Sequence, residues 1–149
     1  MSLSDKIDQD IKKAMLARES KKLEALRAIK AELLLAGTEK KAAGKISGQT
    51  EMQILQKLVK QRKESAGLYR EKGREDLAAT EEFQSDVIEK YLPEQLGEGE
   101  IKTILADIIK ETGASGIKDM GKVMGMATKK LSGKADNKTI ADLAKQMLG

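Results

Sequence analysis

The chain has 149 residues, of which 35% are charged and only 2% are aromatic, and it contains no His, Cys or Trp. Without Cys and His it cannot build zinc sites from those ligands, Cys or Ser-His-Asp nucleophiles, haem ligation by those residues, or disulfides. Acid–base chemistry would fall to Asp, Glu, Lys or Tyr. The formal net charge of +4 is too small to identify an anionic partner by itself.

The composition favours an all-α fold. A hydrophobic content of 40% can supply an aliphatic core, and a single Pro with few β-branched runs argues for helices over strands. At this length we expect one domain or two small ones. The first residues lack the pattern of a signal peptide, and no apolar run approaches the ~20 residues of a membrane span. We therefore expect a cytoplasmic protein with no membrane contact, metal or cofactor.

Apolar residues recur at helical spacing from the start of the chain. They predict a helix over residues 5–19 with Ser4 as its N-cap, and then a second helix over residues 20–36 that Gly37 ends. Residues 37–49 show no such period, so we expect a solvated loop there, with a functional basic loop as the alternative.

A long helix is predicted to follow this loop. Thr50 and Gln53 match a capping box, which indicates the start of a helix that reaches Lys72. A fourth helix, over residues 75–91, should stop before Pro93, because the residue that precedes a Pro is disfavoured in a helix.

The segment after this stop, residues 93–99, is predicted to be a boundary. It separates an N-terminal region of long helices, residues 1–92, from a C-terminal three-helix domain, residues 93–149. The helices of that domain are expected over residues 100–112, 117–132 and 137–148, the last with Asp136 as its N-cap.

One side of the helix over residues 117–132 is basic. At 100° per residue, Lys118, Lys122 and Lys129 lie within roughly 40° of one another, with Gly125 in the same stripe and Gly121 at its edge. Gly inside a helix costs about 1 kcal/mol relative to Ala, so the two glycines need an explanation. Either they allow close helix packing beside solvated lysines, or they let a polyanion backbone approach while the lysines neutralise its phosphates.

The turn Gly133-Lys134-Ala135-Asp136 follows, and Lys130, Lys134 and Lys138 would extend the positive field around it. Residues 117–149 carry 7 Lys against 3 acidic residues and no Arg. A helix–turn–helix reader of DNA is the less favoured interpretation, because the last helix has few side chains suited to base edges.

A second charged constellation surrounds the predicted turn between the third and fourth helices. We interpret it as a structural network in which Arg and carboxylate side chains pair across the turn. An active site built on Asp76 or Glu81 is the alternative, but neither metal-ligand spacing nor a phosphate-binding Gly loop accompanies them.

Five motifs occur together along the chain. They are Lys60-Gln61-Arg62-Lys63-Glu64-Ser65, Gly73-Arg74-Glu75-Asp76-Leu77 with Glu81, Tyr91-Leu92-Pro93-Glu94-Gln95-Leu96, Lys118-Asp119-Met120-Gly121-Lys122-Val123-Met124-Gly125 and Gly133-Lys134-Ala135-Asp136. With them, essentially the whole chain resembles the YqeY family. The C-terminal half also resembles the tail domain of GatB, the subunit of the glutamine-dependent aspartyl/glutamyl-tRNA amidotransferase that activates and amidates the aminoacyl-tRNA.

The resemblance implies an all-α fold of two helical subdomains and contact with tRNA, because the GatB tail domain grips the body of its tRNA. The catalytic body of GatB has no counterpart here, so amidotransferase, a carbon–nitrogen ligase, is expected as a family label and not as an activity of this chain alone. The contact residues that the resemblance implies are Lys118, Gly121, Lys122, Gly125, Lys129, Lys130, Gly133 and Lys134.

We therefore expect an RNA-binding accessory module for tRNA or another structured RNA, with amidotransferase or synthetase subunits as further partners. Stacking on RNA bases needs aromatic rings or Arg side chains. The aromatics Tyr69, Phe83 and Tyr91 lie on or near predicted packing faces, and the last 33 residues contain no Arg. RNA contact in those residues should therefore be lysine on phosphate, which reads shape and not base sequence. The alternative is a protein-interaction adaptor that binds no nucleic acid.

Overall fold

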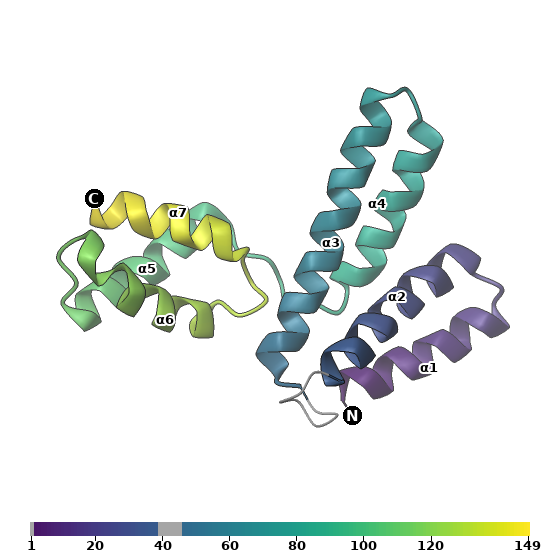
Figure 1. Cartoon of the computed structure of the whole chain (residues 1–149), viewed down its shortest axis with the longest axis horizontal. Helices are drawn as coiled ribbons and strands as arrows, with labels where there is room; N and C mark the ends of the chain where they lie inside the picture. The colour runs from purple at the N-terminus through teal and green to yellow at the C-terminus, as the bar shows by residue number, and fades with distance from the viewer. Residues whose placement is uncertain (1, 39–45) are drawn as a thin grey trace. The chain divides into compact units, whose positions relative to one another are not determined.

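The computed structural model describes residues 2–38 and 46–149, and these residues are all-helical, as predicted (Figure 1). Within the described ranges there are seven α-helices, one short 3-10 helix and no strand. Their bounds are α1 (Leu3–Leu16), α2 (Ser20–Gly37), α3 (Gly48–Glu71), α4 (Glu75–Glu89), α5 (Glu98–Thr112), η1 (Ile117–Asp119), α6 (Met120–Lys130) and α7 (Asn137–Leu148).

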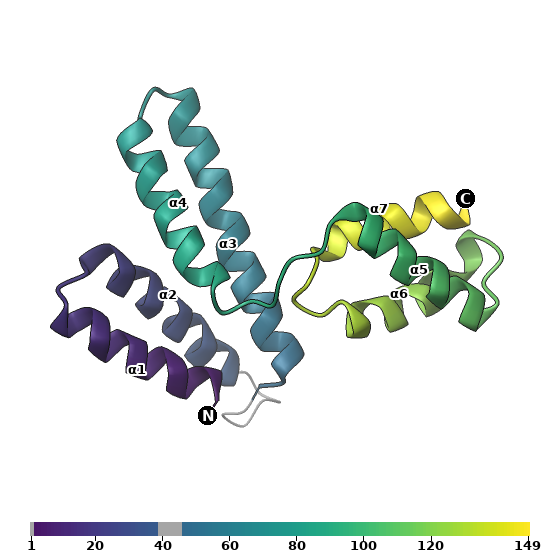
Figure 2. The ribbon, with the colours of Figure 1, turned by 180° about the vertical axis from the view of Figure 1, so that it is seen from behind.

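The chain divides into two compact units, Met1–Leu92 and Pro93–Gly149, which we call unit 1 and unit 2. In unit 1, α1 lies beside α2 and α3 lies beside α4, as both ribbon views show (Figures 1 and 2). Helix α2 also packs against α4, which joins the two helix pairs. In unit 2, α5, α6 and α7 pack on one another in a three-helix arrangement.

Each unit has its own aliphatic core. Full burial of a Leu or Ile side chain contributes about 1.5–3 kcal/mol, so these clusters dominate the stability of each unit. The largest fully buried side chains of unit 1 are Ile7, Leu26, Ile29, Leu55 and Ile88. Those of unit 2 are Ile101, Leu105, Ile108, Val123, Leu131 and Ile140.

The start of α1 differs from the prediction. The N-cap is Ser2, whose hydroxyl accepts a hydrogen bond from the Asp5 backbone N–H at 3.1 Å. The Asp5 carboxylate accepts one from the Ser2 backbone N–H at 3.3 Å, which completes a capping box. The predicted cap, Ser4, therefore lies inside the helix, because Ser2 has a carboxylate three residues later and both partners satisfy free N–H groups.

The predicted capping box at the start of α3 is wrong. The N-cap is Ser47, whose hydroxyl accepts from the Thr50 backbone N–H at 3.1 Å, so Thr50 already lies in the first turn and Gln53 beyond it. Of the predicted loop over residues 37–49, the stretch 39–45 lies outside the described residues.

The helix predicted over residues 117–132 is interrupted near its start. Residues 117–119 form η1, and the α-helix proper ends at Lys130 and not at Ser132. The neighbouring Gly116 is extended, so the chain enters α6 through one tight turn. In the part of the chain that the structure describes, no helix is long and apolar enough to cross a membrane.

Candidate nucleic-acid interface

The lysines predicted to form one basic stripe lie on the surface of unit 2. Lys122 and Lys129 are exposed on α6, and Lys118 is exposed in η1, directly before it. None of the three has an ion pair with a described residue, so their charges are not neutralised within the described part of the protein. The orientation of Lys122 and Lys129 follows from the opposite side of α6, where Val123 and Ala127 are completely buried. We call Lys118, Lys122 and Lys129 the α6 lysines.

Gly121 and Gly125 are exposed between the α6 lysines. A Cβ atom added at either glycine would meet no heavy atom within 4 Å. Close packing of these glycines against another described helix of this chain, one of the two explanations that the sequence left open, is therefore wrong. The approach of an external backbone, the other explanation, is not tested by this geometry and stays a prediction.

Lys130 points to a different environment. Its Nζ lies 3.5 Å from a carboxylate oxygen of Glu111 on α5, and both side chains are at least half exposed. An exposed ion pair of this kind contributes about 0–1 kcal/mol. The structure therefore gives Lys130 an internal partner, which sets it apart from the α6 lysines.

The turn after α6 is held by the segment at the start of unit 2. Gly133 has φ +75°, in the left-handed region that favours glycine. Its carbonyl accepts from Gln95 Nε2 at 2.6 Å, and the Lys134 carbonyl accepts from the Leu96 backbone N–H at 2.9 Å. Two of the five sequence motifs thus meet here, and they fix the backbone from which the exposed Lys134 projects.

Asp136 precedes α7 at the N-cap position, as predicted, but its side chain makes no capping hydrogen bond. Its backbone carbonyl accepts from the Ile140 N–H at 3.1 Å. The carboxylate of Asp119, before α6, is used within unit 2, since it accepts from the Ser115 backbone N–H at 2.9 Å.

The charged constellation in unit 1 is a structural network, as interpreted from the sequence. Arg70 on α3 binds Glu75 across the α3–α4 turn at 3.0 Å and also contacts Glu82 on α4. Arg74 binds Asp76 at 3.2 Å. Hydrogen bonds from these guanidinium groups lower the pKa of Glu82 and of Asp76. Sequence reasoning missed Arg70, the centre of the network, because it lies outside the five motifs.

Further along the same helix pair, Arg62 and Lys63 of the first motif also face α4. Arg62 Nε donates to the buried Gln84 side chain at 3.2 Å, and Lys63 Nζ lies 2.6 Å from Glu89. Glu81, which the sequence offered as an active-site alternative, has no ion pair or side-chain hydrogen bond with a described residue. Much of the motif's charge is thus used to join α3 to α4.

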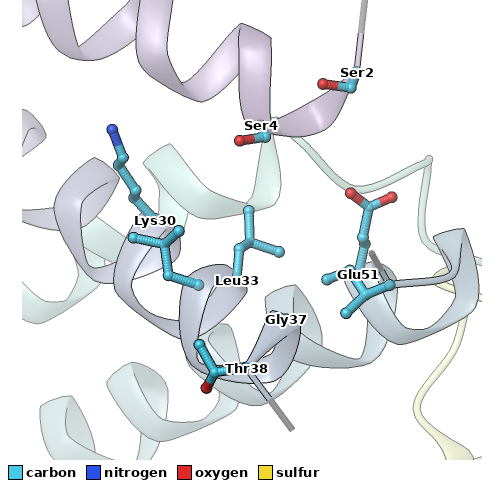
Figure 3. Close-up of a pocket in the computed structure, with 9 residues that line it drawn as sticks. Ser2, Ser4, Lys30, Leu33, Gly37, Thr38 and Glu51 are labelled. Atoms are coloured by element: carbon cyan, nitrogen blue, oxygen red, sulfur yellow. The ribbon is translucent and has the colours of Figure 1, made fainter. Parts of the chain in front are cut away.

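A hollow of about 510 Å³ lies between the N-terminus of α1, the end of α2 and the start of α3. Figure 3 shows Lys30 and Glu51 on opposite sides of Leu33, so the two charged groups do not meet. Lys30 is instead paired with Asp8 at 2.7 Å, and partial burial raises the pKa of Glu51. Among the described residues that line the hollow, no acid and base are paired with one another.

Acidic side chains do not gather into a metal site in residues 2–38 or 46–149, where no three Asp or Glu lie close enough to hold an ion.

Comparison with known proteins places the chain in one family. The family described as Yqey-like protein matches residues 4–148. The chain is also similar to "Altered inheritance of mitochondria protein 41, mitochondrial" from Pyrenophora tritici-repentis (strain Pt-1C-BFP). The two are 29% identical over 148 residues, which cover 97% of this chain and 80% of that protein. The relative's name gives a location for that protein and no activity.

Proposed function

Because the chain belongs to the YqeY-like family, we propose that it is an RNA-binding accessory module whose preferred ligand is tRNA. The α6 lysines carry the proposal: Lys122 and Lys129 are exposed cations on one side of α6, Lys118 is exposed in η1 directly before it, and none has an ion pair with a described residue. A protein that neutralises phosphates with lysines gains affinity by releasing the condensed counterions of the nucleic acid.

The exposed glycines also support the proposal that this surface binds RNA. With no side chain at Gly121 and Gly125, the helix backbone can approach a sugar–phosphate chain while the flanking lysines reach its phosphates. Lys134 extends this surface from the turn after α6, and Lys130 contributes less because it shares its charge with Glu111.

The chemistry of unit 2 restricts how it would recognise RNA. Residues 93–149 contain no Arg and no aromatic residue, so they offer neither guanidinium planes nor rings for base stacking. Lysine contacts to phosphate position a nucleic acid without reading its bases. Unit 2 is therefore proposed to bind RNA by its shape and charge.

The resemblance to the GatB tail domain suggests where such a module would act. We propose that the chain works beside amidotransferase or synthetase subunits and is not catalytic alone, since it lacks the body that carries out amidation. A cytoplasmic location is part of this proposal, although the relative from Pyrenophora tritici-repentis is named for mitochondria.

The test is binding of total tRNA to the purified chain at ~50 mM salt, where phosphate contacts are strong. Replacing Lys122→Glu together with Lys129→Glu should weaken binding at least tenfold. The control is Lys57→Glu with Lys60→Glu on α3, which makes the same change in net charge at exposed lysines of unit 1. We expect the control to lose less than threefold, and absence of tRNA binding by the unmodified chain would refute the proposal.

A protein-interaction adaptor is the second candidate, and exposed leucines favour it. Leu34 and Leu35 near the end of α2 are each 61% exposed. Under this alternative, a purified amidotransferase subunit would bind the chain with an affinity that nuclease treatment does not change and that Leu34→Asp with Leu35→Asp abolishes.

A further inference from the structure

Two of the three aromatic side chains in the whole sequence line one cavity of unit 1. The cavity has a volume of about 640 Å³ and lies where α1, the start of α2 and the second half of α4 meet. Phe83 of α4 and Tyr91, just after its end, both line it. Phe83, expected near a packing face, is 44% exposed, so the only Phe in the chain leaves much of its ring accessible at this cavity.

Some of the charged groups around the cavity are already engaged. The Tyr91 hydroxyl donates to the Asp10 carboxylate, and burial together with this bond raises the pKa of Tyr91. Lys22 lies 3.9 Å from Glu19. These two contacts leave a smaller set of lining groups available to a ligand.

That remaining set is one ring, one hydrogen-bond acceptor and one cation: Phe83, Asp86 and Lys90. Neither charged side chain has an ion pair or a side-chain hydrogen bond with a described residue, and both are exposed. Lys90 is the C-cap residue of α4 and keeps helical backbone angles, so the spacing of i, i+3 and i+7 puts all three within roughly 60° on one face and within about 10 Å along the helix axis. The helix holds the face in place because Val87 and Ile88 are buried.

We propose that this cavity binds one unpaired nucleotide, with its base stacked on Phe83, an exocyclic amino group donating to Asp86 and its phosphate at Lys90. Unpaired bases bind proteins by stacking on aromatic side chains, with hydrogen bonds at their polar edges. A carboxylate accepts from the N4 amino group of cytosine, which uracil lacks. The cavity volume lies in the ordinary range of small-ligand sites, about 300–1,000 Å³.

This inference rests on the proposed function in taking the ligand to be part of an RNA, and it adds a second mode of recognition. The α6 lysines of unit 2 offer phosphate contacts alone. The cavity in unit 1 supplies the ring and the acceptor that the α6 lysines lack, so it can select an unpaired base of the RNA.

The experiment titrates the full chain with cytidine 5′-monophosphate, uridine 5′-monophosphate and cytidine, following backbone amide shifts by NMR. Binding of the cytidine nucleotide should shift α4 resonances, and Phe83→Leu should weaken it at least fivefold. Asp86→Ala should remove the preference for cytidine over uridine nucleotide. Because both ligands carry the same phosphate, this ratio is insensitive to the change in charge. Lys90→Gln should abolish the preference for the nucleotide over cytidine.

The matched control is Tyr69→Leu, which removes an aromatic ring from α3 outside the cavity and should leave nucleotide binding unchanged. Circular dichroism of each variant checks that the helices are retained. Nucleotide binding that Phe83→Leu leaves unchanged would overturn the inference. If tRNA binds through the α6 lysines while no nucleotide binds at α4, the inference fails and the proposed function stands. If nucleotides bind and tRNA does not, the proposed function fails instead.

Discussion

Buried polar side chains of this fold differ in whether they have a hydrogen-bond partner. Gln84 and Ser85 are adjacent buried polar residues on α4. Gln84 accepts a hydrogen bond from Arg62, whereas the Ser85 hydroxyl has no partner among the described residues. A buried hydroxyl without a hydrogen bond loses its solvation and gains nothing in return.

We therefore expect Ser85→Ala to stabilise unit 1. Removing an unsatisfied buried hydroxyl should raise the free energy of unfolding by about 1 kcal/mol, and Ala is also the better helix former. In a chain of this size the gain corresponds to a rise in Tm of about 2–4 °C. Thermal and urea unfolding followed by circular dichroism would measure it.

The control for this prediction is Thr112→Val in α5, whose hydroxyl donates to the Ile108 carbonyl at 2.8 Å. That change removes a hydroxyl that has a partner, so no stabilisation is expected from it. A loss of stability in Ser85→Ala would show that its hydroxyl is hydrogen-bonded in solution.

At the scale of the helix, α6 combines poor helix-forming residues with an exposed basic side. A Cβ added at Gly121 or Gly125 meets no neighbour, so Gly→Ala at both positions should stabilise the helix by up to about 1 kcal/mol each. The same methyl groups would stand between the helix backbone and a bound RNA. We expect the double variant to unfold at a higher denaturant concentration, measured by chemical denaturation. We also expect it to bind tRNA several-fold more weakly, measured by filter binding.

Gly67 on α3 provides the matched control for the α6 glycines. It too is exposed within a helix, and an added Cβ would meet nothing within 4 Å. Gly67→Ala should therefore stabilise its helix without changing tRNA affinity. Equal tRNA affinities for the unmodified chain, the α6 double variant and Gly67→Ala would show that the α6 glycines do not contact RNA.

Helical periodicity made the element types predictable, but the ends of the helices were less so. Several residues near each start can cap a helix: Ser2 and Ser4 are both suitable before α1, as are Ser47 and Thr50 before α3. The choice depends on which neighbouring carboxylate or hydroxyl is in reach, as Asp5 is for Ser2. Helical periodicity alone does not show which residue caps the helix.

The two candidate sites also differ in how far they can be predicted from the sequence. The basic side of α6 lies on one helix, so its residues follow from spacing within a short segment of sequence. The cavity at Phe83 needs α1, α2 and α4 to meet, and the distance in sequence between Asp10 and Tyr91 hides their contact. Sequence reasoning therefore proposed the lysines as contact residues, which stays a prediction, and placed Phe83 near a packing face.

Across the whole molecule, charge is distributed unevenly along the chain. Residues 1–92 carry 19 Lys and Arg against 16 acidic residues, and residues 93–116 carry 2 against 5. Residues 117–149 carry 7 against 3, so the basic part of unit 2 follows directly on an acidic part that includes α5. An RNA attracted by unit 2 should meet its α6 side and be repelled from the acidic residues of α5.

This distribution predicts the salt dependence of tRNA binding. The logarithm of the binding constant falls with the logarithm of salt concentration by about 0.9 for each duplex phosphate neutralised. The three α6 lysines should therefore give a slope of about −2.7, and participation of Lys134 should steepen it to about −3.6. Filter binding of tRNA between ~50 and ~200 mM salt would measure the slope.

Neutral substitutions separate this effect from a general change in charge. Lys122→Gln with Lys129→Gln should reduce the magnitude of the slope by about 1.8, because two phosphate contacts are lost. Lys57→Gln with Lys60→Gln on α3 removes the same net charge and should leave the slope where it was. A slope near zero in the unmodified chain is incompatible with phosphate recognition. Equal slopes in the two double variants would place the contact away from α6, since only direct neutralisation of phosphates changes the number of counterions released.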